Sequence, residues 1–215
     1  MLNRTLQKTG PKDLLASHIQ QLKSCTLCPN MVGPVVTHKA VVSKIYLIGQ
    51  APGPREGLFG RPFAWTAGKT LFRWFSGIGI NEERFRSLAY MAAVCRCFPG
   101  KAKGGGDRVP TPLEIETCSG WMEKEFALLK PELVIPVGRL AIDQVLGKHP
   151  LTETIGRQFK RRVFNHTCSI IPLPHPSGAS TWFKREPGKS LLLEALALIE
   201  LTPAWQELLT QVKEK

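Results

Sequence analysis

Long hydrophobic runs are absent from the sequence. No stretch approaches the roughly 18 consecutive apolar residues that a membrane-spanning helix needs, so we expect no membrane partner. The segment from Met1 to Lys12 is polar and basic and lacks the apolar centre of a secretory signal peptide, which favours a cytoplasmic protein. Internal repeats are absent as well. The chain has 215 residues, 43% of them hydrophobic, which predicts a single domain over residues 1–215 and, we expect, a monomer.

Acidic residues are scarce. The sequence has 17 Asp and Glu against 29 Lys and Arg, which gives a net charge of +12. An excess of this size favours a polyanionic partner such as DNA, because neutralising phosphates releases their counterions. A solvated surface that only keeps the protein soluble is the alternative. The cations gather in three clusters, Lys101/Lys103/Arg108, Arg157/Lys160/Arg161/Arg162 and Lys184/Arg185/Lys189.

Six cysteines are present, and disulfides are not expected because the cytoplasm keeps thiols reduced. Cys25 and Cys28 form a C-x-x-C motif, which places two thiolates within reach of one metal ion or cluster. Two more ligands must then come from elsewhere in the chain. Zinc and an iron–sulfur cluster both suit four thiolates. Cys168 stands alone in an apolar run and fits a buried, inert cysteine.

Strand-like and helix-like segments alternate along the chain. Apolar runs predict strands at 42–48, 89–95, 132–138 and 168–176, and helices are expected at 13–23, 67–75, 82–87, 111–129, 139–146 and 191–212, with a break at Pro203. This alternation predicts an α/β fold in which helices cover both faces of a mostly parallel, four-stranded central sheet. The loop over residues 98–110 is rich in glycine and lysine and is expected to be mobile.

Two motifs stand at the carboxyl ends of predicted strands: GQAPG at 49–53 and HPSG at 175–178. Ligands of open α/β sheets bind outside the carboxyl ends of the strands, so we expect these motifs to meet in one pocket. The segment AGKT at 67–70 looks like the end of a P-loop, but that motif needs glycine where Phe63 stands. No G-x-G-x-x-G follows the first strand either. Nucleotide binding is therefore not expected.

The order of several motifs is similar to that of a known family. The segments GQAPGPREGLFGRPF, AGKTL, CRCFPG, PTPLEIETC, VGRLA and PHPSG resemble the uracil-DNA glycosylase superfamily, most of all its iron–sulfur classes, families four and five. The resemblance covers residues 25–177. It implies a three-layer α/β/α sandwich, hydrolytic excision of uracil from single- or double-stranded DNA in base-excision repair, and a [4Fe–4S] cluster.

The resemblance also implies roles for individual residues. The backbone of its first motif lines the base pocket and comprises Gly49, Gln50, Ala51, Pro52 and Gly53. Phe63, in G-R-P-F, matches the phenylalanine that stacks on the base, and His175 with Ser177 matches the second motif. The implied cluster ligands are Cys25, Cys28, Cys97 and Cys118. Cys95 is then a spare.

The sequence departs from the family pattern at two positions. Gln50 stands where family four commonly has glutamate, and Ala93 stands where an asparagine reads uracil. The segment 92–94 is closer to family five, whose members accept a wider set of damaged bases. Excision of uracil alone and excision that includes other deaminated bases, such as hypoxanthine, both remain open.

Cleavage of an N-glycosidic bond needs a donor at the base oxygen and an acceptor near the attacking water. His175 is the candidate donor, helped by backbone N–H groups of residues 50–53. Glu56 is the only acid in the first motif and is the candidate that handles the water. Gln50 could instead position the water, so that formation of the sugar cation would dominate the rate.

Beyond the second motif, the aromatic pair Trp182 and Phe183 stands beside Lys184 and Arg185. A wedge that fills the vacated stack next to phosphate-binding cations is what base flipping requires, so these are candidate DNA contacts. Packing of both aromatics into the core is the alternative. For the whole protein, the alternatives are a non-catalytic iron–sulfur module that binds nucleic acid and an enzyme that traps DNA covalently through His175.

Overall fold

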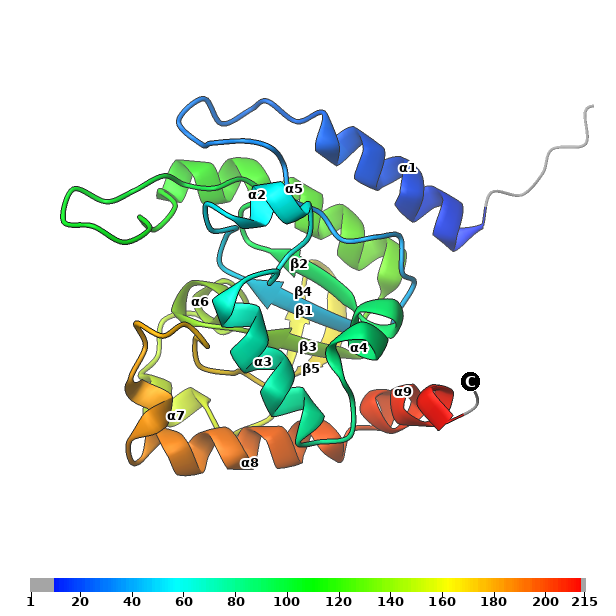
Figure 1. Cartoon of the computed structure of the whole chain (residues 1–215). Coiled ribbons are helices and arrows are strands. Elements are labelled where there is room, and N and C mark those ends of the chain that lie inside the picture. The colour runs from blue at the N-terminus through cyan, green and yellow to red at the C-terminus, as the bar shows by residue number, and fades with distance from the viewer. Residues whose placement is uncertain (1–9, 214–215) are drawn as a thin grey trace, which may run out of the picture.

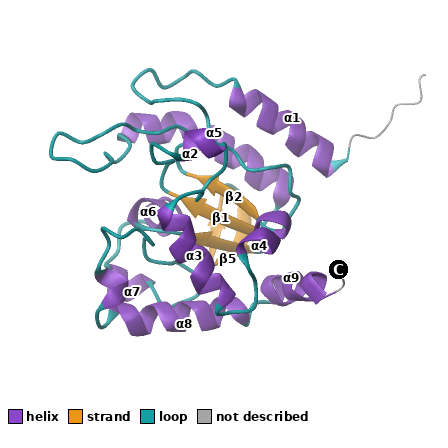
Figure 2. Cartoon of the chain, viewed as in Figure 1, coloured by secondary structure: helices purple, strands orange, loops and turns teal. Residues whose placement is uncertain are grey.

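The computed structural model describes residues 10–213, which form one sheet with helices on both faces (Figures 1 and 2). The strands are β1 (Ile45–Gly49), β2 (Tyr90–Ala93), β3 (Leu133–Pro136), β4 (Phe159–Val163) and β5 (His166–Ile170). Their order in the sheet is β2-β1-β3-β5-β4, with only β4 antiparallel to its neighbour. The mostly parallel α/β sandwich is confirmed. The predicted number of four strands is wrong, because the sheet has five.

The additional strand is β4, which lies at one edge of the sheet. Its three central residues, Lys160, Arg161 and Arg162, are exposed, so it has no apolar run that would have marked it as a strand. Charged residues at an edge are typical, since they discourage pairing with another chain. Phe164 and Asn165 connect β4 to β5 with φ angles of 45° and 62°, the left-handed conformation that a tight hairpin turn requires.

Helices precede and follow the strands in the expected alternation. They are α1 (Pro11–Lys23), α2 (Glu56–Phe59), α3 (Thr66–Ser76), α4 (Glu82–Leu88), α5 (Pro112–Leu129), α6 (Arg139–Leu146), α7 (Leu151–Thr154), the 3₁₀ helix η1 (Trp182–Lys184), α8 (Gly188–Glu200) and α9 (Pro203–Lys213). Thr111 caps α5 in a reciprocal capping box with Glu114. The predicted break at Pro203 is confirmed, since α8 ends at Glu200 and α9 begins at Pro203.

Strand β1 separates two apolar cores. Ile45 and Leu47 face a core formed with α3, α4, α8 and α9, whereas Tyr46 and Ile48 face a second core formed with α1 and α5. All five residues of β1 are buried, as expected of a central parallel strand that is covered on both faces. The glycine-rich segment therefore begins at a rigid point in the middle of the sheet.

The loop over residues 98–110, which the sequence predicts to be mobile, contains a small hairpin. Lys101 and Asp107 pair as an antiparallel bridge, and the N–H of Arg108 donates to the carbonyl of Gly100 at 3.0 Å. The hairpin lies over the carboxyl edge of the sheet and reaches the cavity described below.

Within residues 10–213, the helices lack the combination of length and apolar character that crossing a bilayer demands.

Candidate active site

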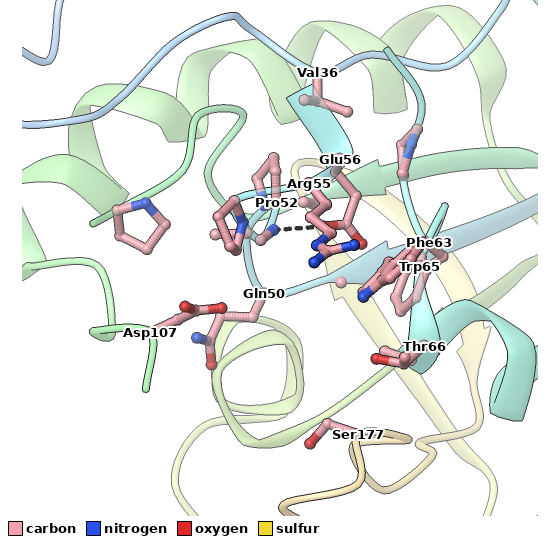
Figure 3. A pocket seen from close by; sticks show the side chains of 18 of the residues that line it. Val36, Gln50, Pro52, Arg55, Glu56, Phe63, Trp65, Thr66, Asp107 and Ser177 are labelled. Carbon is pink, nitrogen blue, oxygen red and sulfur yellow. Dashed lines mark hydrogen bonds between the residues drawn. The ribbon is translucent and has the colours of Figure 1, made fainter. Parts of the chain in front are cut away.

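A cavity of about 620 Å³ opens at the carboxyl ends of β1 and β2 (Figure 3). That volume is in the range of small-molecule sites. Both motifs that follow strands contribute to its lining, so the structure brings them together as the sequence predicts. The lining includes nine residues that the sequence predicts as catalytic or base-binding: Gly49, Gln50, Ala51, Pro52, Gly53, Glu56, Phe63, His175 and Ser177.

Phe63 forms one wall of the cavity and adopts an uncommon backbone conformation, with φ at 52°. A Cβ atom on Gly49 would lie 2.9 Å from Cε2 and Cζ of the Phe63 ring, so the ring covers the backbone where β1 ends. A Cβ atom on Gly68 would collide with the carbonyl oxygen of Phe63. The AGKT segment therefore carries glycine because α3 begins against the Phe63 backbone, and phosphate binding is not needed to explain it.

Arg86, on α4, holds the backbone of Phe63 in place. Its side chain is only 8% exposed, and it donates to the carbonyl oxygens of Pro62 at 2.8 Å and Phe63 at 2.7 Å. Its Nε donates to Glu82 at 2.9 Å, and His38 bonds to its backbone carbonyl at 2.9 Å. The sequence around Arg86 gives no sign of this role, because an arginine on a short helix is ordinarily exposed.

His175 is oriented by its own loop. Its Nδ1 accepts a hydrogen bond from the N–H of Ser177 at 3.2 Å, so the neutral ring carries its proton on Nε2. Burial lowers the pKa of His175 below its ordinary value, which keeps the ring neutral near pH 7. Gly138, at φ 87°, makes room for the ring, because a Cβ atom there would lie 2.8 Å from Cδ2 of His175. The donor that the ring can offer to a ligand is therefore Nε2–H.

Glu56 begins helix α2 and folds back onto the glycine-rich segment. Its Oε2 accepts the N–H of Gly53 at 2.9 Å (Figure 3). Burial and the charge of Asp107 raise the pKa of Glu56, while the Gly53 hydrogen bond and the charge of Arg86 act in the opposite direction. A raised pKa makes the carboxylate a better proton acceptor near neutral pH. The Gly53 N–H is occupied, so it is not available to a base oxygen.

Asp107 also lines the cavity, although no sequence motif marks it. It comes from the hairpin in the 98–110 loop, where its Oδ1 lies 2.6 Å from Nζ of Lys101. Lys101 lines the cavity as well. Asp107 is one acid in a segment of glycines and cations, a composition that predicts a mobile loop. The structure thus adds a second carboxylate to the cavity that holds Glu56.

The two positions of departure, Gln50 and Ala93, both line the cavity. The backbone of the first motif is tied to the chain after β2: the carbonyl of Gln50 accepts the N–H of Cys95 at 3.1 Å, and that of Gly49 accepts the N–H of Val94 at 2.9 Å. Ala93 contributes only a methyl group. The end of β2 therefore offers no side-chain amide to read the edge of a base.

The aromatic pair after the second motif packs inward. Trp182 and Phe183 are partly buried against the core beside α3 and α8, and the Phe183 ring lies edge-on to Trp74 with centroids 5.0 Å apart. Lys184 and Arg185 are exposed. These four residues lie outside the cavity lining. The contacts of the two rings correspond to the packing that the sequence left as the alternative to a wedge.

The cysteines predicted as ligands come from segments that the backbone holds together. Val32, after the C-x-x-C motif, pairs with Phe98 through two hydrogen bonds of 2.7 and 2.9 Å. Arg108 donates to the carbonyl of Asn30 at 3.1 Å and forms an ion pair of 2.6 Å with Glu114 on α5. These contacts join the three segments that carry the predicted ligands, Cys25, Cys28, Cys97 and Cys118.

The thiols influence one another electrostatically. Burial and the charges of Cys118, Cys25 and Cys28 raise the pKa of Cys97 to about 11. The thiol of Cys95 neighbours that of Cys118, and this contact together with burial raises the pKa of Cys95. Over residues 10–213, however, no group of three or more Cys, His, Asp or Glu side chains is already close enough to hold a metal ion.

A buried ionic network lies behind the cysteines. Glu125 on α5 accepts hydrogen bonds from Arg96 at 2.6 and 3.0 Å, from the hydroxyl groups of Tyr90, at 2.8 Å, and Tyr46, and contacts His18 on α1 at 3.3 Å. Burial alone would raise the pKa of Glu125, but the charge of Arg96 and these bonds lower it. A buried pair of this kind is costly to break. These protein contacts fix α1, α5 and the chain after β2 relative to one another.

Comparison with known proteins identifies the family. The sequence profile described as the Uracil DNA glycosylase superfamily matches residues 38–199. The chain is 28% identical over 170 residues to the Type-4 uracil-DNA glycosylase of Archaeoglobus fulgidus, covering 74% of this chain and 79% of that protein. It is 28% identical over 171 residues to the Type-4 enzyme of Thermotoga maritima, covering 77% and 83%. The Type-5 uracil-DNA glycosylase of Thermus thermophilus is 29% identical over 169 residues, covering 63% and 74%.

The profile match runs over every strand of the sheet and over both motifs that line the cavity. It covers well over half of the chain, so it describes the fold and the cavity together rather than one motif. On the strength of this match, the chain belongs to the uracil-DNA glycosylase superfamily.

Proposed function

We propose that this chain is a DNA glycosylase that flips uracil out of DNA and hydrolyses its N-glycosidic bond in base-excision repair. The observation that carries the proposal is the content of one cavity: the Phe63 ring, a neutral His175 with its proton on Nε2, and the carboxylate of Glu56. Membership of the superfamily and relatives named as uracil-DNA glycosylases support the same reaction.

In the proposed reaction the flipped base stacks on Phe63, and the bond between its nitrogen and C1′ of the sugar breaks. The bonding electron pair leaves with the base, so negative charge develops on the base oxygen. The Nε2–H of His175 donates to that oxygen, and a preorganised donor acts most strongly on such developing charge. Because the pKa of His175 is lowered, the ring reaches this step as a neutral donor at pH 7.

Water completes the hydrolysis by bonding to C1′. Glu56 accepts the proton that the water loses, and the raised pKa of Glu56 suits it to this task. The hydrogen bond from Gly53 fixes the carboxylate through Oε2. Gln50 lines the same cavity and is the alternative residue for positioning the water, in which case cation formation at the sugar limits the rate.

We propose a base range that includes hypoxanthine as well as uracil. A site that hydrogen-bonds one base edge through a buried side chain rejects other bases, because the side chain would be left unpaired. Ala93 provides no such group at the end of β2. Discrimination would then depend on backbone groups and on the shape of the cavity.

For the cofactor, we propose a [4Fe–4S] cluster with ligands Cys25, Cys28, Cys97 and Cys118. The donor set fits this group, since it consists of soft thiols from segments that hydrogen bonds and a buried ion pair already hold together. When bound, the cluster would supply iron–thiolate bonds that tie the N-terminal segment to the sheet. The residues that we assign to the hydrolysis are all elsewhere, in the cavity.

The proposed partner is DNA, bound by a monomer with a single domain. The net charge of +12 supports a phosphate partner. Lys184 and Arg185 are exposed on the chain that follows the second motif, and we propose that they contact phosphates. Their contribution would appear as a flatter dependence of DNA affinity on salt when both are replaced by glutamine.

The test uses end-labelled oligonucleotides that carry one uracil, hypoxanthine or xanthine, in single- and double-stranded form. Each is incubated with the purified protein and then treated with alkali, which cleaves abasic sites. We expect alkali-dependent strand breaks at uracil. Bound DNA without breaks would overturn the proposal in favour of a non-catalytic module. A shifted band that survives denaturation, and is lost in His175→Ala, would overturn it in favour of a covalent trap.

A further inference from the structure

An exposed apolar surface lies at the mouth of the cavity. No residue of the short helix α2 is fully buried, and its Leu58 and Phe59 are 86% and 48% exposed. Phe59 stacks on Trp65, with centroids 5.9 Å apart and ring planes at 22°. Trp65 itself lines the cavity. We call Leu58, Phe59 and Trp65 the rim.

Helix α2 is held so that the rim remains open to solvent. A Cβ atom on Gly57 would lie 2.9 Å from Cδ of Pro34, so one side of the helix packs on the chain that follows the C-x-x-C motif. Glu56, at the start of the helix, is bonded back to Gly53. Leu58 and Phe59 are left on the free side. Their exposure is thus a property of a fixed helix, and neighbouring exposed apolar side chains are typical of contact surfaces.

Two cations lie beside the Trp65 ring of the rim. The guanidinium of Arg55 lies 4.3 Å from the centroid of the Trp65 ring, and Nζ of Lys69 lies 5.8 Å from it. Arg55 and Lys69 are exposed, whereas the one acid of α2, Glu56, is turned toward Gly53. Aromatic rings flanked by cations match the chemistry of a nucleic-acid strand, which offers base faces and phosphates in alternation.

The rim is continuous with the cavity. The chain from residue 55 to residue 65 carries Glu56, then the rim residues on α2, then Phe63 and Trp65. A base that entered the cavity against Phe63 would leave its neighbours in the strand next to this surface. The other aromatic pair, Trp182 and Phe183, packs against the core and offers less surface to DNA.

We propose that the rim stacks on the DNA bases that flank the flipped nucleotide, while Arg55 and Lys69 contact the adjoining phosphates. This inference rests on the proposed function, because it assigns the rim a role in holding the same substrate. Leu58 and Phe59 then replace the stacking that the neighbours lose when a base leaves the helix.

The test measures binding to an oligonucleotide with no base to excise. The probe carries a tetrahydrofuran abasic-site analogue beside 2-aminopurine, whose fluorescence reports stacking. The variant is Leu58→Ser/Phe59→Ser, and the matched control is Leu193→Ser, which replaces a leucine that is 60% exposed on α8. We expect the dissociation constant of the rim variant to rise about 5- to 100-fold, which corresponds to the usual worth of base stacking. The change in 2-aminopurine fluorescence on binding should be lost.

The control should remain within about twofold of the wild-type affinity, and the rim variant should keep the wild-type melting temperature, because Leu58 and Phe59 are both exposed. An unchanged affinity and fluorescence change in the rim variant would overturn the inference. Loss of a dimer in sedimentation, with DNA binding unchanged, would assign the rim to a second copy of the chain and also overturn it. Wild-type protein that stacks on this probe but does not release uracil would refute the proposed function alone.

Discussion

The backbone N–H of Ser177 donates to Nδ1 of His175 at 3.2 Å, and this bond assigns the proton of the neutral imidazole to Nε2. Because the Nε2–H donor is already oriented, the ring need not turn when negative charge develops on a departing base. We expect His175→Ala to lower the single-turnover rate of uracil release by about 10²- to 10³-fold, the usual cost of removing one preorganised donor. DNA affinity should change little. Wild-type rates in His175→Ala on every substrate would contradict the assignment.

Gly49 and Phe63 form a second pair that can be tested as a unit. A Cβ atom on Gly49 would lie 2.9 Å from the Phe63 ring, so Gly49→Ala should displace the ring. Phe63→Ala should weaken capture of the flipped base by about 1–3 kcal/mol, the usual worth of base–aromatic stacking. In the Phe63→Ala background, Gly49→Ala should cost little more. Affinity for an uncleavable uracil analogue in the double-mutant cycle checks this, and simple additivity would count against the contact.

The carboxylates of the cavity predict a pH effect. Burial and the charge of Asp107 raise the pKa of Glu56. Glu56 must be ionised to accept a proton from water, so kcat/KM should rise with pH as the carboxyl group of Glu56 deprotonates. Asp107→Asn removes one cause of the raised pKa and frees the charge of Lys101, so the acid limb should move to lower pH. Glu56→Gln should abolish that limb. A limb that persists in Glu56→Gln would assign it to another group.

The part of the site that could be predicted from the sequence is the position of motifs at the carboxyl ends of parallel strands. The first motif follows β1, and HPSG follows the chain after β5, so their meeting in one cavity follows from the rule that parallel strands end at the same edge. Arg86 and Asp107 could not be found in this way. Each reaches the cavity through a contact that local sequence does not encode: hydrogen bonds to Phe63 for Arg86, and a hairpin for Asp107.

The fold shows the same division. Buried strands were predicted because both of their faces are apolar, as in β1. Strand β4 was missed because its exposed Lys160, Arg161 and Arg162 reflect its position at the edge of the sheet, which only the completed fold determines. The exposure of Leu58 was equally unpredictable, because an apolar residue in a short helix is ordinarily assigned to the core.

His38 predicts how stability depends on pH. Burial lowers its pKa from 6.5 to about 4, while its ring bonds to the carbonyl of Arg86 at 2.9 Å. Below pH 6.5 the unfolded chain binds a proton that the folded chain does not, so stability falls as the pH drops toward 4. The full effect is about 3 kcal/mol. Urea midpoints across this range should show a weaker dependence in His38→Gln than in His149→Gln, whose histidine is exposed. Equal slopes would exclude His38 as the cause.

The last prediction concerns which cysteines bind the cluster. Cys95 and Cys97 stand on either side of the buried Arg96, and only one of them is expected to be a ligand. The family pattern favours Cys97 as the ligand, whereas Cys95 has the thiol that neighbours Cys118. Protein purified without oxygen should be brown and contain about four irons per chain, as four-thiolate ligation of a cubane cluster requires.

Replacing Cys97 or Cys118 with serine should remove the iron, because a lost thiolate leaves one corner of the cluster without its ligand. Cys95→Ser and the buried control Cys168→Ser should retain it, measured as iron per chain on folded, monodisperse protein. If Cys97→Ser retains iron and Cys95→Ser loses it, then Cys95 is the cluster ligand in place of Cys97, and the cluster itself still stands. A colourless protein with one zinc would refute the cluster itself. Since the buried Glu125–Arg96 pair joins α5 to the chain after β2 through protein atoms alone, we expect the iron-free variants to keep the fold of the sheet, and circular dichroism checks this independently of colour.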